Sequence, residues 1–271
     1  MANEILFDVT EQIGILRFNR PQARNALNWA AQEQFAAHID QVAQRRDVRA
    51  LILTGSDDVF VAGGDLKELS RGDLAANGQR LSRLMSGALA HMARLPLPVI
   101  AAVNGHAVGG GCEILIACDL RLAVAQARLD FAQIRLGLTT GWGGAARLIQ
   151  LVGRSRAAEI LLRGRTLSAQ EALDIGLLHA VAGEGEDVLA LAVAWAADLV
   201  TLPAPALAAM KQLIGAAQNL KEQDAAQLER RLFNQLWGQP AHRRALDAFL
   251  AQGRADDLPG DAHAAQRDPG R

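Results

Sequence analysis

Two patterns of hydrophobic positions alternate along the first two thirds of the chain. Short apolar runs typical of buried strands occur near residues 5–18, 48–55 and 98–105, and a polar turn inside the first run predicts a hairpin. Between these runs, apolar residues recur at helical spacing over residues 25–45 and 78–94. Strands that alternate with helices in this way predict an α/β core.

The last third of the chain has a different pattern. After the proline-punctuated stretch 200–208, residues 205–252 are Ala-rich and almost wholly helical in pattern. We therefore divide the chain into a core (1–199), a helical oligomerisation region (200–258) and a polar tail (259–271). A helical appendage with too little core of its own packs on a neighbour. Its apolar positions are Leu228, Leu232, Phe233, Leu236, Trp237, Leu246, Phe249 and Leu250.

Composition narrows the class of protein. The chain has 271 residues and a formal net charge of −1, which gives no sign of a nucleic-acid or anionic-membrane surface. Cys112 and Cys118 lie in one apolar run and are expected to be reduced core residues, neither a disulfide framework nor a zinc site. We find no signal-peptide pattern and no apolar run of about 18 residues, so we expect a cytoplasmic protein without a membrane span.

Two strand-to-helix junctions carry glycine pairs, at residues 62–65 and 109–113. Free N–H groups point out of such turns, and the dipole of the following helix adds positive potential. If both junctions face one cavity, two N–H groups can converge on one oxygen and form an oxyanion hole. The alternative is that these glycines only permit tight turns and close packing.

Glu113 follows the second glycine run. It lies three residues after Gly110, so on a helix the two share a face. A carboxylate in apolar surroundings is suited to proton transfer. Otherwise Glu113 is a first-turn acid that complements the helix dipole.

Several of these segments together resemble the crotonase superfamily, the enoyl-CoA hydratase/isomerase family. They occur in the family's order through most of residues 1–181. The matching segments are FNRPQARNALN (18–28), FVAGGDLKE (60–68), VNGHAVGGGCEILIACDLRLA (103–123), LGLTTGWGGAARLIQLVG (136–153) and GRTLSAQEALDIGLLHAV (164–181).

The resemblance implies a crotonase-like spiral of ββα units with a C-terminal helical trimerisation region, in trimers that often pair into hexamers. It implies an acyl-CoA substrate, no metal, and no cofactor beyond the coenzyme A of that substrate. Gly64 and Gly110 match the two oxyanion N–H donors. The implied CoA contacts are Arg24, Ala62, Asp65 and Leu66.

The sequence departs from the family's hydratases at the second catalytic acid. Hydratases pair the glutamate that matches Glu113 with another, and the matching position here is Gln133. A glutamine can hold or orient a water but cannot exchange a proton. Asp130 lies nearby and is either a substitute acid or a solvated loop residue. Glu68 is interpreted as a surface or helix-start residue.

A second departure is Trp142, where many family members have a small residue. It either shapes the acyl pocket or packs against the neighbouring helix. A tryptophan here, with no second glutamate, resembles the ethylmalonyl/methylmalonyl-CoA decarboxylase branch. Decarboxylation needs an oxyanion hole and one proton donor but no base. The chain has no tyrosine, which excludes the tyrosine-dependent decarboxylase type.

Three further positions complete the sequence-based picture. Arg254 is the only cation where the family often carries a basic pair that helps to bind CoA. His106 is interpreted as a packing or pocket-wall residue. RNA binding, known for some crotonase-fold proteins, is disfavoured because the helix at 28–46 carries only Arg45 and Arg46 as cations. We therefore expect an enoyl-CoA hydratase/isomerase-like enzyme, with the acyl-CoA decarboxylase as the alternative.

Overall fold

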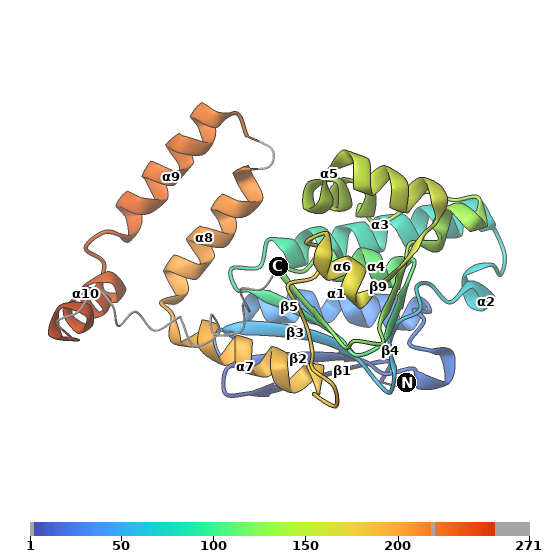
Figure 1. Ribbon diagram of the computed structural model, residues 1–271, viewed down its shortest axis with the longest axis horizontal. Coiled ribbons are helices and arrows are strands. Elements are labelled where there is room, and N and C mark those ends of the chain that lie inside the picture. The colour runs from blue at the N-terminus through green and yellow to red at the C-terminus, as the bar shows by residue number, and fades with distance from the viewer. Residues whose placement is uncertain (1–2, 218–219, 253–271) are drawn as a thin grey trace, which may run out of the picture.

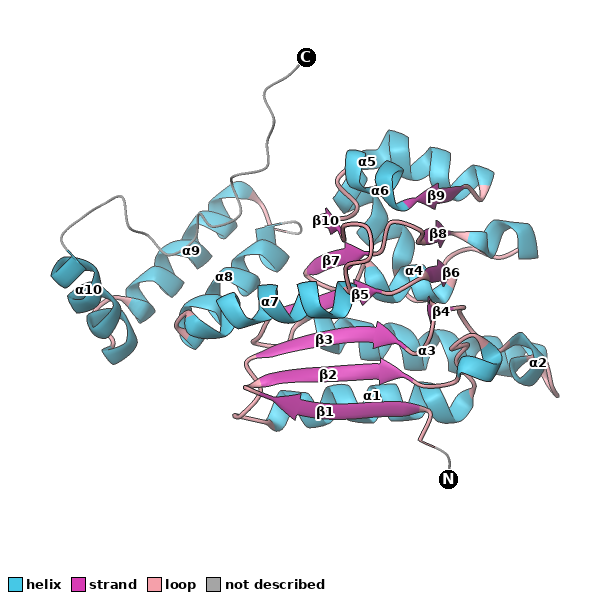
Figure 2. Cartoon of the chain, turned by 60° about the horizontal axis from the view of Figure 1, so that its bottom comes forward, coloured by secondary structure: helices cyan, strands magenta, loops and turns pink. Residues whose placement is uncertain are grey.

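The computed structural model describes residues 3–217 and 220–252, and its core contains two β-sheets (Figure 2). The larger sheet has the order β1-β2-β3-β5-β7-β10 and is parallel except for the β1–β2 hairpin. Its strands are β1 (Ile5–Thr10), β2 (Ile13–Phe18), β3 (Ala50–Gly55), β5 (Val99–Val103), β7 (Leu120–Ala123) and β10 (Ala180–Val181). The smaller sheet has the order β4-β6-β8-β9, with only the β8–β9 pair antiparallel. Its strands are β4 (Val59–Val61), β6 (His106–Val108), β8 (Arg128–Asp130) and β9 (Thr166–Ser168).

Helices cover both faces of the larger sheet (Figure 1). Because side chains alternate across a strand, Leu51 and Leu53 of β3 face the cluster that includes α1 (Trp29–Gln44) and α3 (Leu74–Ala93). Ile52 of β3 faces α7 (Val188–Thr201) on the other side. The central strands are therefore buried on both faces, as expected for parallel strands.

Several helices and 3₁₀ turns follow the ends of strands and carry most of the candidate chemistry. They are the 3₁₀ turns Pro21–Ala23 and Ala132–Leu136, with α2 (Leu66–Leu69), α4 (Gly110–Leu115), α5 (Gly144–Arg163) and α6 (Ala169–Asp174). α5 is interrupted at Gly153, whose φ of 77° is not helical. α6 begins with a capping box formed by Ser168 and Glu171.

The last three described helices form an arm that leaves the core (Figure 1). They are α8 (Ala204–Ala217), α9 (Glu222–Leu236) and α10 (Pro240–Gln252). Leu228 and Leu232 of α9 pack against Ala209 of α8, while Phe233 and Trp237 are exposed. Lys211 of α8 ties the arm to the core, since its Nζ lies 2.7 Å from the Asp119 carboxylate.

The α/β alternation and the hairpin are confirmed, but two helices begin elsewhere than predicted. α1 begins at Trp29 and not near residue 25, because the Asn28 side chain accepts a hydrogen bond from the Ala31 N–H and caps the helix. α3 begins at Leu74 because Asp73 caps it in the same way. The domain limits stay predictions, and both the tail 259–271 and Arg254 lie outside the described residues.

No single helix among the described residues is long and apolar enough to cross a bilayer. Together, α7 and α8 have the length and apolar composition of a membrane span, but one helix is bent by 111° relative to the other.

Candidate active site

The two glycine junctions lie against one another. A Cβ atom on Gly63 would lie 3.4 Å from the nitrogen of Gly110, and one on Gly111 would lie 2.0 Å from the carbonyl oxygen of Val61. The chain can approach itself this closely only because these positions lack side chains. Gly109 adopts φ 53°, ψ −111°, which turns the chain from β6 into α4. The two junctions are thus in contact, and that both face one cavity stays a prediction.

Neither predicted oxyanion donor has an acceptor in the part of the chain that the structure describes. The Leu27 N–H donates to the Gly63 carbonyl, and the Leu27 carbonyl accepts from the Asp65 N–H. The Gly64 N–H lies between these two bonds and takes part in neither. Gly110 is the first residue of α4, where N–H groups lack intrahelical partners. Within residues 3–217 and 220–252, neither N–H donates a hydrogen bond to the protein.

Glu113 is buried, with 2% of its surface exposed, and both of its oxygens are saturated. Oε1 accepts from the Gln133 side-chain Nε2 at 3.0 Å and from the Gly141 N–H at 3.2 Å. Oε2 accepts from the backbone N–H groups of Trp142 at 2.8 Å and Gly144 at 2.9 Å. Four N–H donors replace the water that burial removes, which explains how an acid is tolerated here.

The beginning of α5 is shaped around that carboxylate. Gly143 precedes the helix with φ 88°, and the N–H groups on both sides of it, of Trp142 and Gly144, donate to Glu113. A Cβ on Gly144 would lie 2.7 Å from the Glu113 Cγ. Arg147 donates from Nη1 to the Trp142 carbonyl at 2.7 Å and fixes this turn from the other side. Burial lowers the pKa of Arg147, and the Glu113 charge opposes that shift.

Gln133 and Asp130 have different environments. Gln133 contacts the Glu113 carboxylate, and its own Oε1 is buried without a hydrogen-bond partner among the described atoms. Asp130 lies on β8 and forms an ion pair with Arg135 at 2.5 Å. The structure therefore brings the predicted Gln133 to Glu113 and gives Asp130 a cationic partner of its own.

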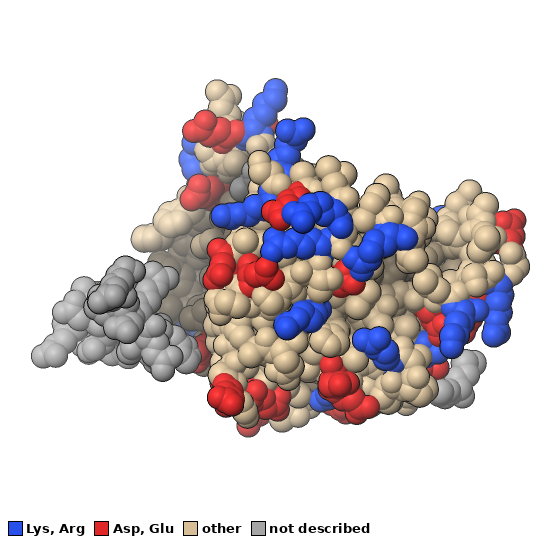
Figure 3. Space-filling model, turned by 45° about the vertical axis from the view of Figure 1, so that its right-hand side comes forward, with Lys and Arg blue, Asp and Glu red and all other residues tan. Residues whose placement is uncertain are grey.

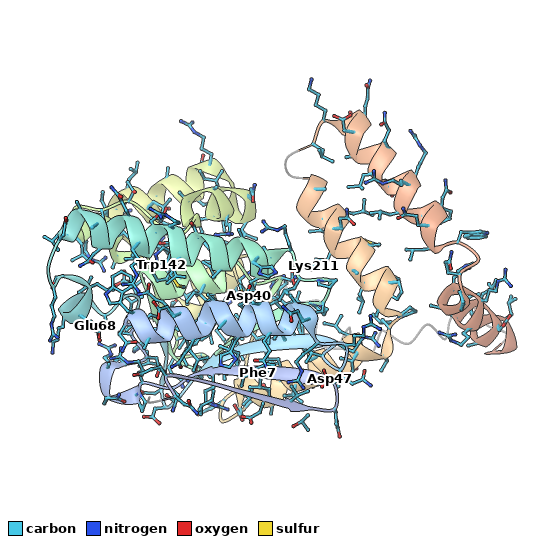
Figure 4. All side chains as sticks on the ribbon, turned by 180° about the vertical axis from the view of Figure 1, so that it is seen from behind. Phe7, Asp40, Asp47, Glu68, Trp142 and Lys211 are labelled. Carbon is cyan, nitrogen blue, oxygen red and sulfur yellow. The ribbon has the colours of Figure 1, made fainter. Side chains whose placement is uncertain are left out.

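Trp142 lies directly on Gly110. If Gly110 had a Cβ, the ring atoms Cη2 and Cζ3 of Trp142 would be 2.1 and 2.2 Å from it. Only 4% of the Trp142 surface is exposed, and the ring belongs to the main hydrophobic cluster. Figure 4 shows Trp142 at the same end of the molecule as Glu68, with Lys211 toward the arm.

The residues predicted to contact CoA lie on two neighbouring segments. The Arg24 carbonyl accepts from the Ala62 N–H at 3.2 Å, which joins 24–27 to 62–65. Asp65 forms an ion pair with Arg20 at 3.0 Å, and Leu66 is 54% exposed. Glu68 lies in the first turn of α2, as predicted, and its Oε1 accepts from the N–H of Trp29, the first residue of α1.

A cavity of about 400 Å³ adjoins Arg24. His106 lines it, with a buried Nδ1 that has no partner among the described atoms. Gly64, Gly110 and Glu113 do not line this cavity. Figure 3 shows that basic side chains are interspersed with acidic ones on one end of the molecule. Separately, Arg165 forms ion pairs with Glu159 and Glu171.

Both cysteines are free and buried, as predicted. Burial, reinforced by the Asp130 charge, raises the pKa of the Cys112 thiol well above its usual value. Burial likewise raises the pKa of Cys118 to about 12. Neither thiol is therefore a nucleophile at neutral pH.

What the sequence did not identify is the set of backbone donors around Glu113. The signal was present in TTGWGGAARL (139–148), because glycines that lead into a helix expose N–H groups suited to an anion. The sequence does not say which anion they meet.

Solved structures with the same fold define the class of protein. The chain has the crotonase fold, since it superimposes on an enoyl-CoA hydratase from Bacillus anthracis with a TM-score of 0.88, covering 92% of this chain and 96% of the other at 29% identity. The model of the enoyl-CoA hydratase/isomerase family matches residues 8–256, so the chain belongs to this family.

Two curated relatives represent different reactions. A probable enoyl-CoA hydratase of Rhizobium meliloti is 33% identical over 252 residues, covering 93% of this chain and 96% of that one. The ethylmalonyl-CoA decarboxylase of Gallus gallus is 31% identical over 236 residues, covering 86% and 79%. The predicted family and fold class are thus confirmed, and the protein is an enzyme of the crotonase type.

Proposed function

We propose that this protein binds an acyl-CoA thioester and stabilises its enolate between the N–H groups of Gly64 and Gly110. The observation that carries this proposal is the pair of unused N–H groups at two touching junctions. Charge develops on the thioester oxygen when the α-carbon loses a proton or a carboxylate. Donors already in place at that oxygen lower the barrier, by about 100- to 1,000-fold in rate for each donor.

Glu113 transfers the proton in this proposal, and Oε1 is the oxygen that does so. Oε2 is fixed by two backbone N–H groups at 2.8 and 2.9 Å. Oε1 has the longer bond to Gly141 and a bond to the side chain of Gln133, which can rotate away. A proton arriving at Oε1 then displaces one side-chain donor and leaves the backbone unchanged.

Arg24, Ala62, Asp65 and Leu66 contact the CoA portion of the substrate, and Trp142 contacts the acyl portion. The exposed apolar residues of α8–α10 are buried between copies of the chain in a trimer or hexamer. We assign the enzyme to the cytoplasm, which two buried free thiols favour, and propose no cofactor beyond the CoA of the substrate.

Gln133 favours a second candidate, decarboxylation of an ethylmalonyl- or methylmalonyl-type thioester. In that reaction the electrons of the broken C–C bond become the enolate, CO₂ leaves, and a proton then reaches the α-carbon. No second glutamate is needed to activate water. The likeness to a decarboxylase of Gallus gallus supports this candidate.

The purified protein is first incubated with crotonyl-CoA and then with ethylmalonyl- and methylmalonyl-CoA. Loss of the enoyl-thioester absorbance without CO₂ release identifies a hydratase and excludes the decarboxylase. Release of CO₂ from a malonyl-type thioester, with crotonyl-CoA unchanged, identifies the decarboxylase. If neither substrate class reacts or binds, the proposed function is wrong.

Gln133→Glu tests whether the missing second acid limits hydration. Two carboxyl groups about 3 Å apart share a proton, so the variant gains the acid that Gln133 lacks. Hydration of crotonyl-CoA should rise about tenfold or more, within the range of general acid–base catalysis. The control is Gln126→Glu, the same charge change at an exposed site. An unchanged rate would mean that the loop does not face the substrate.

A further inference from the structure

Trp142 has the features of a rigid wall. Its N–H is bound to Glu113 at 2.8 Å and its carbonyl to Arg147 at 2.7 Å, so the main chain is fixed on both sides of the ring. The ring is almost fully buried within the main hydrophobic cluster. Moving it would open a gap in a close-packed core, which interiors resist.

That wall lies beside the position of the thioester. A carbonyl oxygen bonded to the Gly110 N–H places the α-carbon of the acyl group within about 6 Å of the Gly110 nitrogen. The ring of Trp142 packs on the Cα of the same residue, leaving no room for even one methyl group at Gly110. The ring and the first carbons of the acyl chain therefore both lie within a few ångström of Gly110.

We infer that Trp142 restricts the substrate to short acyl groups by closing the acyl end of the site. This rests on the proposed function, because it takes the oxyanion at Gly110 as the anchor. The ring fills the space next to Gly110. Each additional methylene of the acyl chain therefore meets an indole carbon. A long acyl chain enters only if the ring leaves its place.

The test is binding of unreactive saturated thioesters, so it does not depend on which reaction the enzyme performs. Dissociation constants of butyryl-CoA and octanoyl-CoA are measured by calorimetry on the full chain for wild type, Trp142→Ala and Trp142→Phe. The wild type should bind butyryl-CoA more tightly. Trp142→Ala should shift the ratio of the two constants toward octanoyl-CoA by about tenfold or more, as expected for a few methylenes in an apolar pocket.

Trp142→Phe keeps part of the wall and should give a smaller shift in the same direction, which preserves the test if the alanine variant does not fold. The matched control is Trp195→Phe on α7, whose ring packs on the opposite face of the larger sheet. It should leave the ratio unchanged.

Equal wild-type affinity for both thioesters would overturn the inference while leaving the proposed function intact. So would an equal loss of affinity for both in the Trp142 variants. If the wild type binds neither thioester nor free CoA, the proposed function and this inference fall together.

Discussion

The beginnings of α4 and α5 use the same device in opposite ways. Each helix follows a glycine with positive φ, Gly109 in one case and Gly143 in the other. At α4 the Gly110 N–H has no acceptor among the described residues. At α5 the N–H groups of 141, 142 and 144 all end on the carboxylate of Glu113.

The start of α4 thus leaves a donor available for a ligand oxygen, whereas the start of α5 already binds an anion. A glycine-rich turn into a helix offers N–H donors, but the sequence of the turn does not say whether they are occupied. Here Glu113 belongs to α4, whereas its backbone donors belong to the turn before α5 and to Gly144, the first residue of α5. The carboxylate therefore positions the second helix start relative to the first, as well as being the candidate for proton transfer.

Replacing Glu113 is the strongest way to break this arrangement. In Glu113→Gln, the new amide nitrogen would face N–H donors, so one pair of donors would lose its acceptor. We expect turnover to fall by about 100- to 10,000-fold while CoA still binds. Stability should fall by about 1–3 kcal/mol, because buried donors are left unpaired. Steady-state kinetics and urea unfolding measure the two effects.

Asp130→Asn is the companion variant, since it removes the other nearby acid together with its ion pair to Arg135. It should keep most of the turnover. Full activity in Glu113→Gln, with loss in Asp130→Asn, would transfer the chemistry to Asp130.

Gly144→Ala displaces the carboxylate without removing it. The added Cβ would lie 2.7 Å from the Cγ of Glu113 and 2.8 Å from its Oε2. Relieving this overlap displaces the carboxylate, and a displacement of about 1 Å at a catalytic group costs on the order of 100-fold in kcat/KM. Gly141→Ala is the matched control, because its Cβ meets no atom within 4 Å and its N–H is kept.

The two glycine variants are compared on whichever thioester proves active. The loss in Gly144→Ala should exceed that in Gly141→Ala by about tenfold or more. Equal losses would indicate that the turn, and not the position of Glu113, limits the reaction.

The sequence predicted the start of α4, with its unused N–H group, better than the start of α5, whose N–H groups bind Glu113. Glycines at two strand ends, with an acid one turn after the second, predicted where donors and an acid lie, and the family resemblance implied the roles of Gly64, Gly110 and Glu113, which stay predictions. Helix starts were less well placed, because a cap such as Asn28 or Asp73 acts through one hydrogen bond that apolar periodicity does not register.

Contacts between distant segments were beyond the sequence. Gln133 was recognised as a departure, but its bond to Glu113 spans 20 residues and depends on how the 3₁₀ turn Ala132–Leu136 and α4 are placed. Trp142 had two interpretations, pocket wall or packing, and the structure shows that the ring packs on Gly110, which is itself part of the candidate site. A residue can thus serve both roles when its packing partner is the backbone that binds the ligand.

A double-mutant cycle on Gly110 and Trp142 measures how strongly the indole ring holds the start of α4. Gly110→Ala should destabilise the wild type by about 1–3 kcal/mol, because its Cβ would overlap the indole ring at 2.1 Å. In a Trp142→Ala background the overlap is gone. Alanine is a better helix former than glycine by up to about 1 kcal/mol, so the same change should then be neutral or stabilising. Urea unfolding of the four proteins gives the coupling energy, and a coupling near zero would mean that the ring of Trp142 does not rest on Gly110 in solution.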